Sequence, residues 1–195
     1  MSLQIAPDFD SDQWHALQLE EPDSADWRTA VSVLKSRILV RYLQPVDILI
    51  NEEADKEGWD RRFGFTVLAI DCLLVETLGA FIEGLTTTDG VSKKTFCSFL
   101  TTRPEFANEF PKPVAEQFYR DFRCGILHQA ETSNQSKVWS VGPIIWDKNG
   151  SLVVNRNAFH QTLTQAFLNY LEELSDPCAI QLRQNFRKKM DFIAR

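Results

Sequence analysis

Histidine and cysteine are scarce in this chain, which excludes several kinds of site. The 195 residues include three histidines and four cysteines, and no two cysteines form a CxxC pair. Cysteine and histidine are not grouped at the spacing of a zinc site, so we predict no metal, no cofactor and no disulfide framework. Unpaired cysteines are typical of a reducing compartment, so we expect the protein to be cytoplasmic.

Basic residues are missing from the start of the chain, where the first is Arg28. There is also no apolar core of the kind found in signal peptides, so we expect no export. Acidic residues are frequent there. We interpret residues 1–25 as an acidic N-terminal arm, loosely held and docked through aromatics such as Phe9 and Trp14. The net charge of -6 argues against binding of nucleic acid by the whole surface, although a local basic patch is compatible with it.

One apolar run, from Phe63 to Ile82, approaches the length of a membrane span. It carries Asp71 and Glu76 near its middle, and carboxylates are costly in the hydrocarbon of a bilayer. We therefore predict a buried core helix and no membrane association.

Residues 26–195 are predicted to form a single helical domain. Apolar residues recur at helical spacing in several segments, and Pro45 should kink or break the first helix near Gln44. Pro104 and Pro111 should forbid regular helix until Pro113 begins a new one. The expected helices cover about 26–50, 63–85, 93–101, 113–129, 159–174 and 182–193.

A small β-hairpin is expected to interrupt the helices at about 137–154. Asn149-Gly150 lies between two segments rich in β-branched and aromatic residues, which is a strong hairpin signal. The predicted fold class is all-α, a bundle of about five to six helices with one inserted hairpin.

The segment Arg123-Cys124-Gly125-Ile126-Leu127-His128 holds the residues best suited to chemistry. It places a permanent cation and a titratable imidazole near the end of a predicted helix. A structural role is the alternative: Arg123 would pair with Glu76 or Asp71 on the central helix, and His128 would cap or pack near a helix end.

The chain resembles the HEPN superfamily. Bacterial members of that group are similar to it in the segment FYRDFRCGILHQ and in the Trp-containing hairpin that follows. The most specific part of the resemblance is the motif formed by Arg123 and His128, an arginine and a histidine separated by four residues. The resemblance implies a HEPN-like bundle and a homodimer whose facing motifs form a composite site. It also implies cleavage of RNA without metal, with Arg123 binding phosphate and His128 acting as acid or base. The chain departs from this pattern at two positions. Many catalytic members have a polar residue where this chain has Cys124, and a toxin subgroup has tyrosine where this chain has Ala130.

Elementary chemistry leads to the same pair of residues. Attack of a 2′-hydroxyl on the adjacent phosphate needs a base, an acid and a cation to stabilise the phosphoryl oxygens. One chain offers one suitable histidine, whereas a two-fold dimer offers two. A non-catalytic HEPN-like module that binds RNA, nucleotide or a partner protein is the alternative function, and a structural dimer without ligand is a third. The sequence does not identify a cognate antitoxin or a regulatory protein.

Helix geometry complicates this site. Five steps along an ideal helix place Arg123 and His128 about 140 degrees apart, so they do not share a face. We therefore expect either a distortion at Gly125 or a contact across to a partner chain. Arg120 lies on the stripe of His128 and is a reserve candidate for the phosphate contact.

Weaker signals each have an ordinary structural explanation. The last helix is basic, which fits a solvated helix end, with RNA contact as the alternative. Cys124 is more typical of a small buried thiol than of a nucleophile. Trp139 and Trp146 should pack the hairpin onto the bundle, with stacking on bases as the alternative. His15 and His160 are expected at the surface or at its boundary. The basic residues of the last helix are Arg183, Arg187, Lys188, Lys189 and Arg195.

Overall fold

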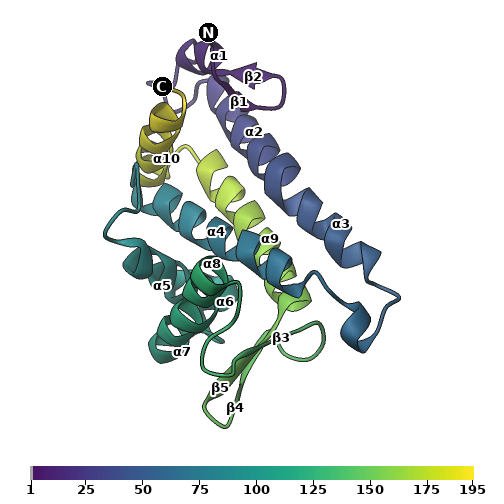
Figure 1. The fold of residues 1–195 in the computed structure, drawn as a ribbon. Helices are drawn as coiled ribbons and strands as arrows, with labels where there is room; N and C mark the ends of the chain where they lie inside the picture. Colours follow the sequence, from purple (N-terminus) through teal and green to yellow (C-terminus); the bar gives the residue numbers. More distant parts are fainter. Residues whose placement is uncertain (1) are drawn as a thin grey trace.

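The central element is helix α4 (Gly64–Glu83), around which the other long helices pack (Figure 1). The computed structural model describes residues 2–195. Leu68 and Leu74 of α4 are both fully buried although they lie about 120° apart around the helix, which explains its apolar composition. It ends at Gly84, whose φ of 68° allows Leu85 N to donate to the carbonyl of Ala80 at 2.9 Å, an arrangement that closes the last turn.

The first long helix is interrupted where proline predicted it. Helix α2 (Asp26–Ile38) passes through a π-helical turn (Leu39–Leu43) into α3 (Gln44–Glu52) without a change of direction (Figure 1). Pro45 lacks an N–H, and its ring crowds the carbonyl of the preceding turn. The wider π turn directly before it accommodates both effects, so the helix is locally widened near the predicted position but is neither kinked nor broken there.

Proline 104 begins a helix instead of excluding one. After α5 (Ser92–Thr102), the single turn α6 (Pro104–Ala107) precedes α7 (Lys112–Phe118). The prediction of no regular helix between Pro104 and Pro113 was therefore wrong. The reason is positional: the missing N–H of proline costs nothing in a first helical turn, where it would have no partner in the helix.

The predicted hairpin is present as part of a larger sheet. Strands β4 (Ile145–Lys148) and β5 (Ser151–Asn155) pair antiparallel around Asn149 and Gly150, whose φ values are 57° and 84°. The segment from Val138 to Trp146, expected as one strand of the hairpin, is instead divided into strand β3 (Lys137–Trp139) and strand β4, and β3 pairs parallel to β5, which makes the order β3-β5-β4. The division falls around Gly142, whose φ is 92°, and Pro143, which has no N–H for a ladder.

The remaining helices, α9 (Arg156–Ser175) and α10 (Ile180–Ile193), complete the bundle. The side chain of Asn155 accepts hydrogen bonds from the first-turn amides of α9, so strand β5 leads directly into a capped helix. Two aromatic clusters fill the core. One stacks Phe118 on Phe159 at 5.1 Å, and the other surrounds Phe186 at the opposite end.

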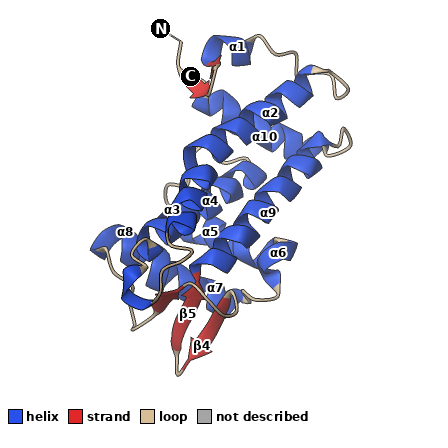
Figure 2. Cartoon of the chain, turned by 90° about the vertical axis from the view of Figure 1, so that its right-hand side faces the viewer, coloured by secondary structure: helices blue, strands red, loops and turns tan. Residues whose placement is uncertain are grey.

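The acidic N-terminal segment is folded onto the bundle. It forms strands β1 (Gln4–Ala6) and β2 (Phe9–Asp10) and helix α1 (Ser11–His15), at the end of the molecule opposite the β-sheet (Figure 2). Trp14 is buried with its ring edge against Phe186 at 5.9 Å, and its Nε1 donates to Asp191 at 2.8 Å. The expected docking through Trp14 and Phe9 is present, since Trp14 belongs to the same core as α2 and α10 and Phe9 packs against it, and the segment also forms regular elements that were not expected.

Helix α4 alone, among the helices of residues 2–195, is long and apolar enough to cross a membrane. Of the most apolar 18-residue stretch of α4, 56% is buried inside the bundle. Its position at the centre of the core accounts for its hydropathy.

Trp14→Ala should lower the free energy of unfolding by about 3–5 kcal/mol, because a large buried ring is lost and Asp191 loses its donor. Urea unfolding followed by circular dichroism measures this. Leu3→Ala is the control, since Leu3 is exposed and should change stability by less than about 0.5 kcal/mol. A Trp14 variant as stable as the wild type would show that this segment contributes little to the fold.

Candidate functional site

Arg123 lies in a π-helical turn (Tyr119–Cys124) between α7 and α8 (Gly125–Gln129). The expected distortion is therefore present, but it lies directly before Gly125 and not at it. Glycine is needed at 125 for a different reason: an added Cβ would lie 2.5 Å from the carbonyl oxygen of Glu131, where the chain turns back past the helix.

The Arg123 guanidinium is fixed on the central helix. Its Nε and Nη2 donate to Glu76 Oε2 at 3.2 and 3.0 Å, and its Cζ lies 5.4 Å from the centre of the Tyr119 ring. Thr88 and Ser92 donate their hydroxyls to the same carboxylate at 2.5 and 2.8 Å. Burial alone would raise the pKa of Glu76, but these hydroxyls and Arg123 outweigh it and lower the pKa. The predicted partnership of Arg123 with Glu76 is thus present in the structure.

A shallow pocket of about 230 Å³ opens beside Arg123. Leu73 and Leu127 line it and are 44% and 49% exposed, while the Arg123 and Glu76 side chains retain 19% and 13% exposure. Water can therefore reach the guanidinium, and the rest of the lining mixes apolar side chains with Thr77, Thr88 and Lys189.

His128 does not line this pocket. It is exposed at the C-terminal end of α8, and among residues 2–195 its side chain has no hydrogen-bond or ion-pair partner. One chain therefore places the two motif residues near each other without joining them in a single site.

Arg120, the reserve candidate, donates from Nε to the neighbouring Asp121 at 2.9 Å. Asp121 is fully buried and also accepts from Asn134 at 2.6 Å and Ser136 at 3.0 Å. Arg120 therefore belongs to a carboxylate-centred network that fixes the loop between α8 and β3.

His160 is buried, which corrects the prediction that it lies at the surface or its boundary. Its Nδ1 lies 2.8 Å from Asp71 Oδ1, and its Nε2 lies 3.4 Å from Asp47 Oδ1. Asp71, proposed as a support for Arg123, is instead the partner of His160. Burial lowers the pKa of His160, but the hydrogen bond and charge of Asp71, together with the charge of Asp47, outweigh it and raise the pKa. No local spacing pattern indicates this pair, because 89 residues separate its members.

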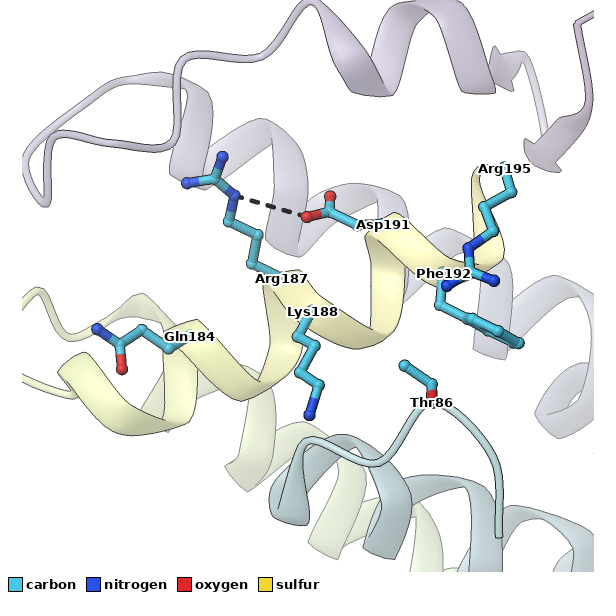
Figure 3. Close-up of a pocket in the computed structure, with 7 residues that line it drawn as sticks. All are labelled: Thr86, Gln184, Arg187, Lys188, Asp191, Phe192 and Arg195. Atoms are coloured by element: carbon cyan, nitrogen blue, oxygen red, sulfur yellow. Dashed lines mark ion pairs between the residues drawn. The ribbon is translucent and has the colours of Figure 1, made fainter. Parts of the chain in front are cut away.

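The basic residues of α10 are mostly engaged within the chain. Figure 3 shows Arg187 paired with Asp191 and the Arg195 side chain beside the Phe192 ring. Arg183 lies over the Trp27 ring at 4.4 Å, Arg187 pairs with Glu20 at 2.7 Å, and Arg195 stacks on Phe192 at 4.1 Å. Lys189 donates to the carbonyl of Thr86 at 2.6 Å. These contacts agree with the structural explanation of the basic helix.

Comparison of this chain with protein-family models, with curated proteins and with solved structures found no match.

The raised pKa of His160 predicts a dependence of stability on pH. A group whose pKa is higher in the folded chain than the unfolded value of about 6.5 stabilises the fold below that pH, and the contribution is lost as the pH rises through the folded pKa. The difference in unfolding free energy between wild type and His160→Gln should therefore shrink from about pH 6.5 upward. Urea titrations at a series of pH values measure it, with the exposed Gln161→Ala as control. A constant or growing difference would contradict a raised pKa.

Proposed function

We propose that this chain is a HEPN-like, cytoplasmic protein that acts as a homodimeric, metal-independent endoribonuclease. Arg123 and His128 of two copies form one composite site. The observation that carries this proposal is that Glu76 holds Arg123 in place beside a solvent-open pocket, while the nearby His128 side chain is accessible and without a partner among residues 2–195.

Arg123 keeps donors for a ligand after it has bonded to Glu76. Glu76 engages Nε and Nη2, which leaves the two Nη1 donors for a phosphoryl oxygen. The contact with Glu76 restricts the rotamers of a long side chain, so less conformational entropy is lost when phosphate binds. Glu76 is therefore a positioning residue in this proposal.

His128 is the histidine that chemistry can use. His160 is enclosed with Asp71, and His15 Nε2 lies 3.2 Å from the carbonyl oxygen of Ala194. Cleavage by a 2′-hydroxyl requires proton transfer to and from oxygen near neutral pH, and imidazole serves both steps. A second copy supplies the second imidazole, which is why the proposal includes a dimer.

The faces of α4 and α8 beside the motif fit a self-complementary contact. Leu73 and Leu127 expose apolar side chains on adjacent helices next to Arg123. Burial of this pair against the same pair of a second copy would remove apolar surface from water and bring two copies of the motif together.

A non-catalytic HEPN-like module that binds RNA, nucleotide or a partner protein is the second candidate. The observation that favours it is the compensation of the Arg123 charge by Glu76, which weakens its attraction for phosphate. Binding without cleavage is the outcome that distinguishes this candidate.

Purified wild-type protein should cleave mixed RNA in the presence of EDTA, and His128→Ala should reduce the rate by about 10²–10⁴-fold through loss of proton transfer. Gln129→Ala is the matched control, because this exposed neighbour should leave the rate unchanged. Cleavage that survives His128→Ala would place the chemistry elsewhere. If the wild type cleaves nothing and Arg123→Ala weakens RNA binding, the second candidate replaces the first.

Leu127→Glu should shift the protein from dimer to monomer in sedimentation experiments, because it introduces charge into the proposed apolar contact. Ile180→Glu, at an exposed position on α10, serves as the control and should not change the mass. A wild type that stays monomeric at all accessible concentrations would rule out the composite site.

A further inference from the structure

We propose that a second site, separate from Arg123 and His128, binds a phosphorylated nucleotide. The site is a pocket of about 750 Å³ between the start of α4 and strand β3, here called the Arg156 pocket. The residues that carry the argument are Arg61, Arg62, Gly64, Phe65, Trp139 and Arg156, all of which line it. Its volume lies within the usual range of about 300–1,000 Å³ for small-molecule sites.

Positive charge is concentrated in this pocket although the chain is acidic overall. Three arginines line it and no carboxylate does. The Arg62 side chain is 78% exposed, and the ion pair that it makes, with the exposed Asp60, is long at 3.9 Å. Arg61 is positioned by hydrogen bonds to the carbonyl of Lys56 at 2.5 Å and to the hydroxyl of Ser140. One guanidinium is therefore fixed and the other is free to close on an anion.

Arg156 supplies a buried guanidinium, and only some of its N–H donors have hydrogen-bond partners. Its side chain is 3% exposed, and its Nη2 pairs with Glu53. Its Nη1 is buried without a hydrogen-bond partner among residues 2–195. Glu53 also accepts from the backbone amides of Arg62 and Phe63, so its charge is shared among several donors. A buried donor without an acceptor is destabilising, and an anion in this pocket would compensate the excess positive charge.

The first turns of two helices meet at the same pocket. Gly64 begins α4 and Arg156 begins α9, and each helix has 20 residues. The start of α4 carries no side-chain cap, so its first amides remain available as donors. A Cβ at position 64 would lie 3.1 Å from Val138 Cγ1 and 3.8 Å from Arg156 Cδ, so glycine keeps this approach open. Both helix dipoles favour negative charge here.

Aromatic side chains give the pocket a surface for a planar ring. Trp139 is 46% exposed, and its ring is held at 89° to the Trp146 ring with centroids 5.9 Å apart. Phe65 is also partly exposed at the pocket wall. Of the two explanations given for Trp139, base stacking therefore has the support of an adjacent anion site. Phosphate beside an exposed indole is the chemistry that recognises a nucleotide.

Two sources of this ligand share one chemistry: a free mononucleotide and the phosphorylated end of an RNA. Isothermal titration of the full chain with AMP, adenosine, inorganic phosphate and a short 5′-phosphorylated RNA separates them. We expect AMP to bind more tightly than adenosine or phosphate, with an affinity that falls as salt rises. An RNA that binds more tightly than AMP and is displaced by it would identify the RNA end as the source.

Arg62→Ala should weaken AMP binding by about tenfold, the effect of losing one charge-assisted hydrogen bond. Trp139→Ala should weaken AMP binding by a similar factor of about ten and leave phosphate binding unchanged, because it removes only the stacking surface. Arg28→Ala, an exposed arginine on α2, is the control and should bind AMP as the wild type does. Both tested positions are exposed, so circular dichroism should show intact folds.

Unchanged AMP affinity in both pocket variants would overturn the proposal, as would equal affinities for AMP and phosphate. His128→Ala keeps the two hypotheses distinguishable. It should lose RNA cleavage and retain AMP binding, whereas loss of AMP binding in this variant would show that nucleotide binds at the motif instead of the Arg156 pocket.

Discussion

The two acidic residues in the middle of α4 are the constraint on which the bundle depends. A helix enclosed by partners cannot leave a carboxylate without a hydrogen-bond donor, because burial penalises the charged form. Asp71 is paired with His160 of α9, and Glu76 is paired with Arg123 between α7 and α8. Each pair joins the central helix to a different part of the chain. The buried polar pairs therefore require the same packing of helices as the apolar core does. Whether these pairs add net stability is a separate matter, since desolvation offsets much of the attraction.

The predictable part of the fold was the part with strong periodicity or strong turn chemistry. Helical spacing indicated α4 and α9, Pro45 indicated a disruption near Gln44, and Asn149-Gly150 indicated the hairpin. The single turn α6 escaped prediction because it has too few residues for a pattern, and the predicted strand from Val138 to Trp146 was not expected to divide into β3 and β4. In the N-terminal segment, docking through Trp14 was expected, but acidic composition hid the short strands and helix that accompany it.

The candidate site was predictable only as far as residue chemistry allows. The sequence identified Arg123 and His128, and Glu76 was named as a partner of Arg123. It could not assign Asp71 to His160, since contacts between residues so distant in sequence leave no local spacing pattern. The sequence also did not indicate the Arg156 pocket, because Arg61 and Arg62 lie far from Arg156 along the chain. These arginines meet where β5 leads into α9 beside the start of α4.

The two proposed phosphate sites differ in how much positive charge they offer a bound anion. At Arg123, an incoming phosphate competes with Glu76 for the same guanidinium, which weakens ground-state binding. Cleavage would place additional negative charge on the phosphoryl oxygens, whereas the charge of Glu76 stays the same. The attraction of Arg123 for the phosphate would therefore increase towards the transition state. In the Arg156 pocket, Arg62 has little competition and two helix starts add to its field, which favours stable binding. In both proposals a carboxylate holds an arginine, Glu76 at Arg123 and Glu53 at Arg156, and the two places differ in the further positive charge that Arg61 and Arg62 bring to the Arg156 pocket.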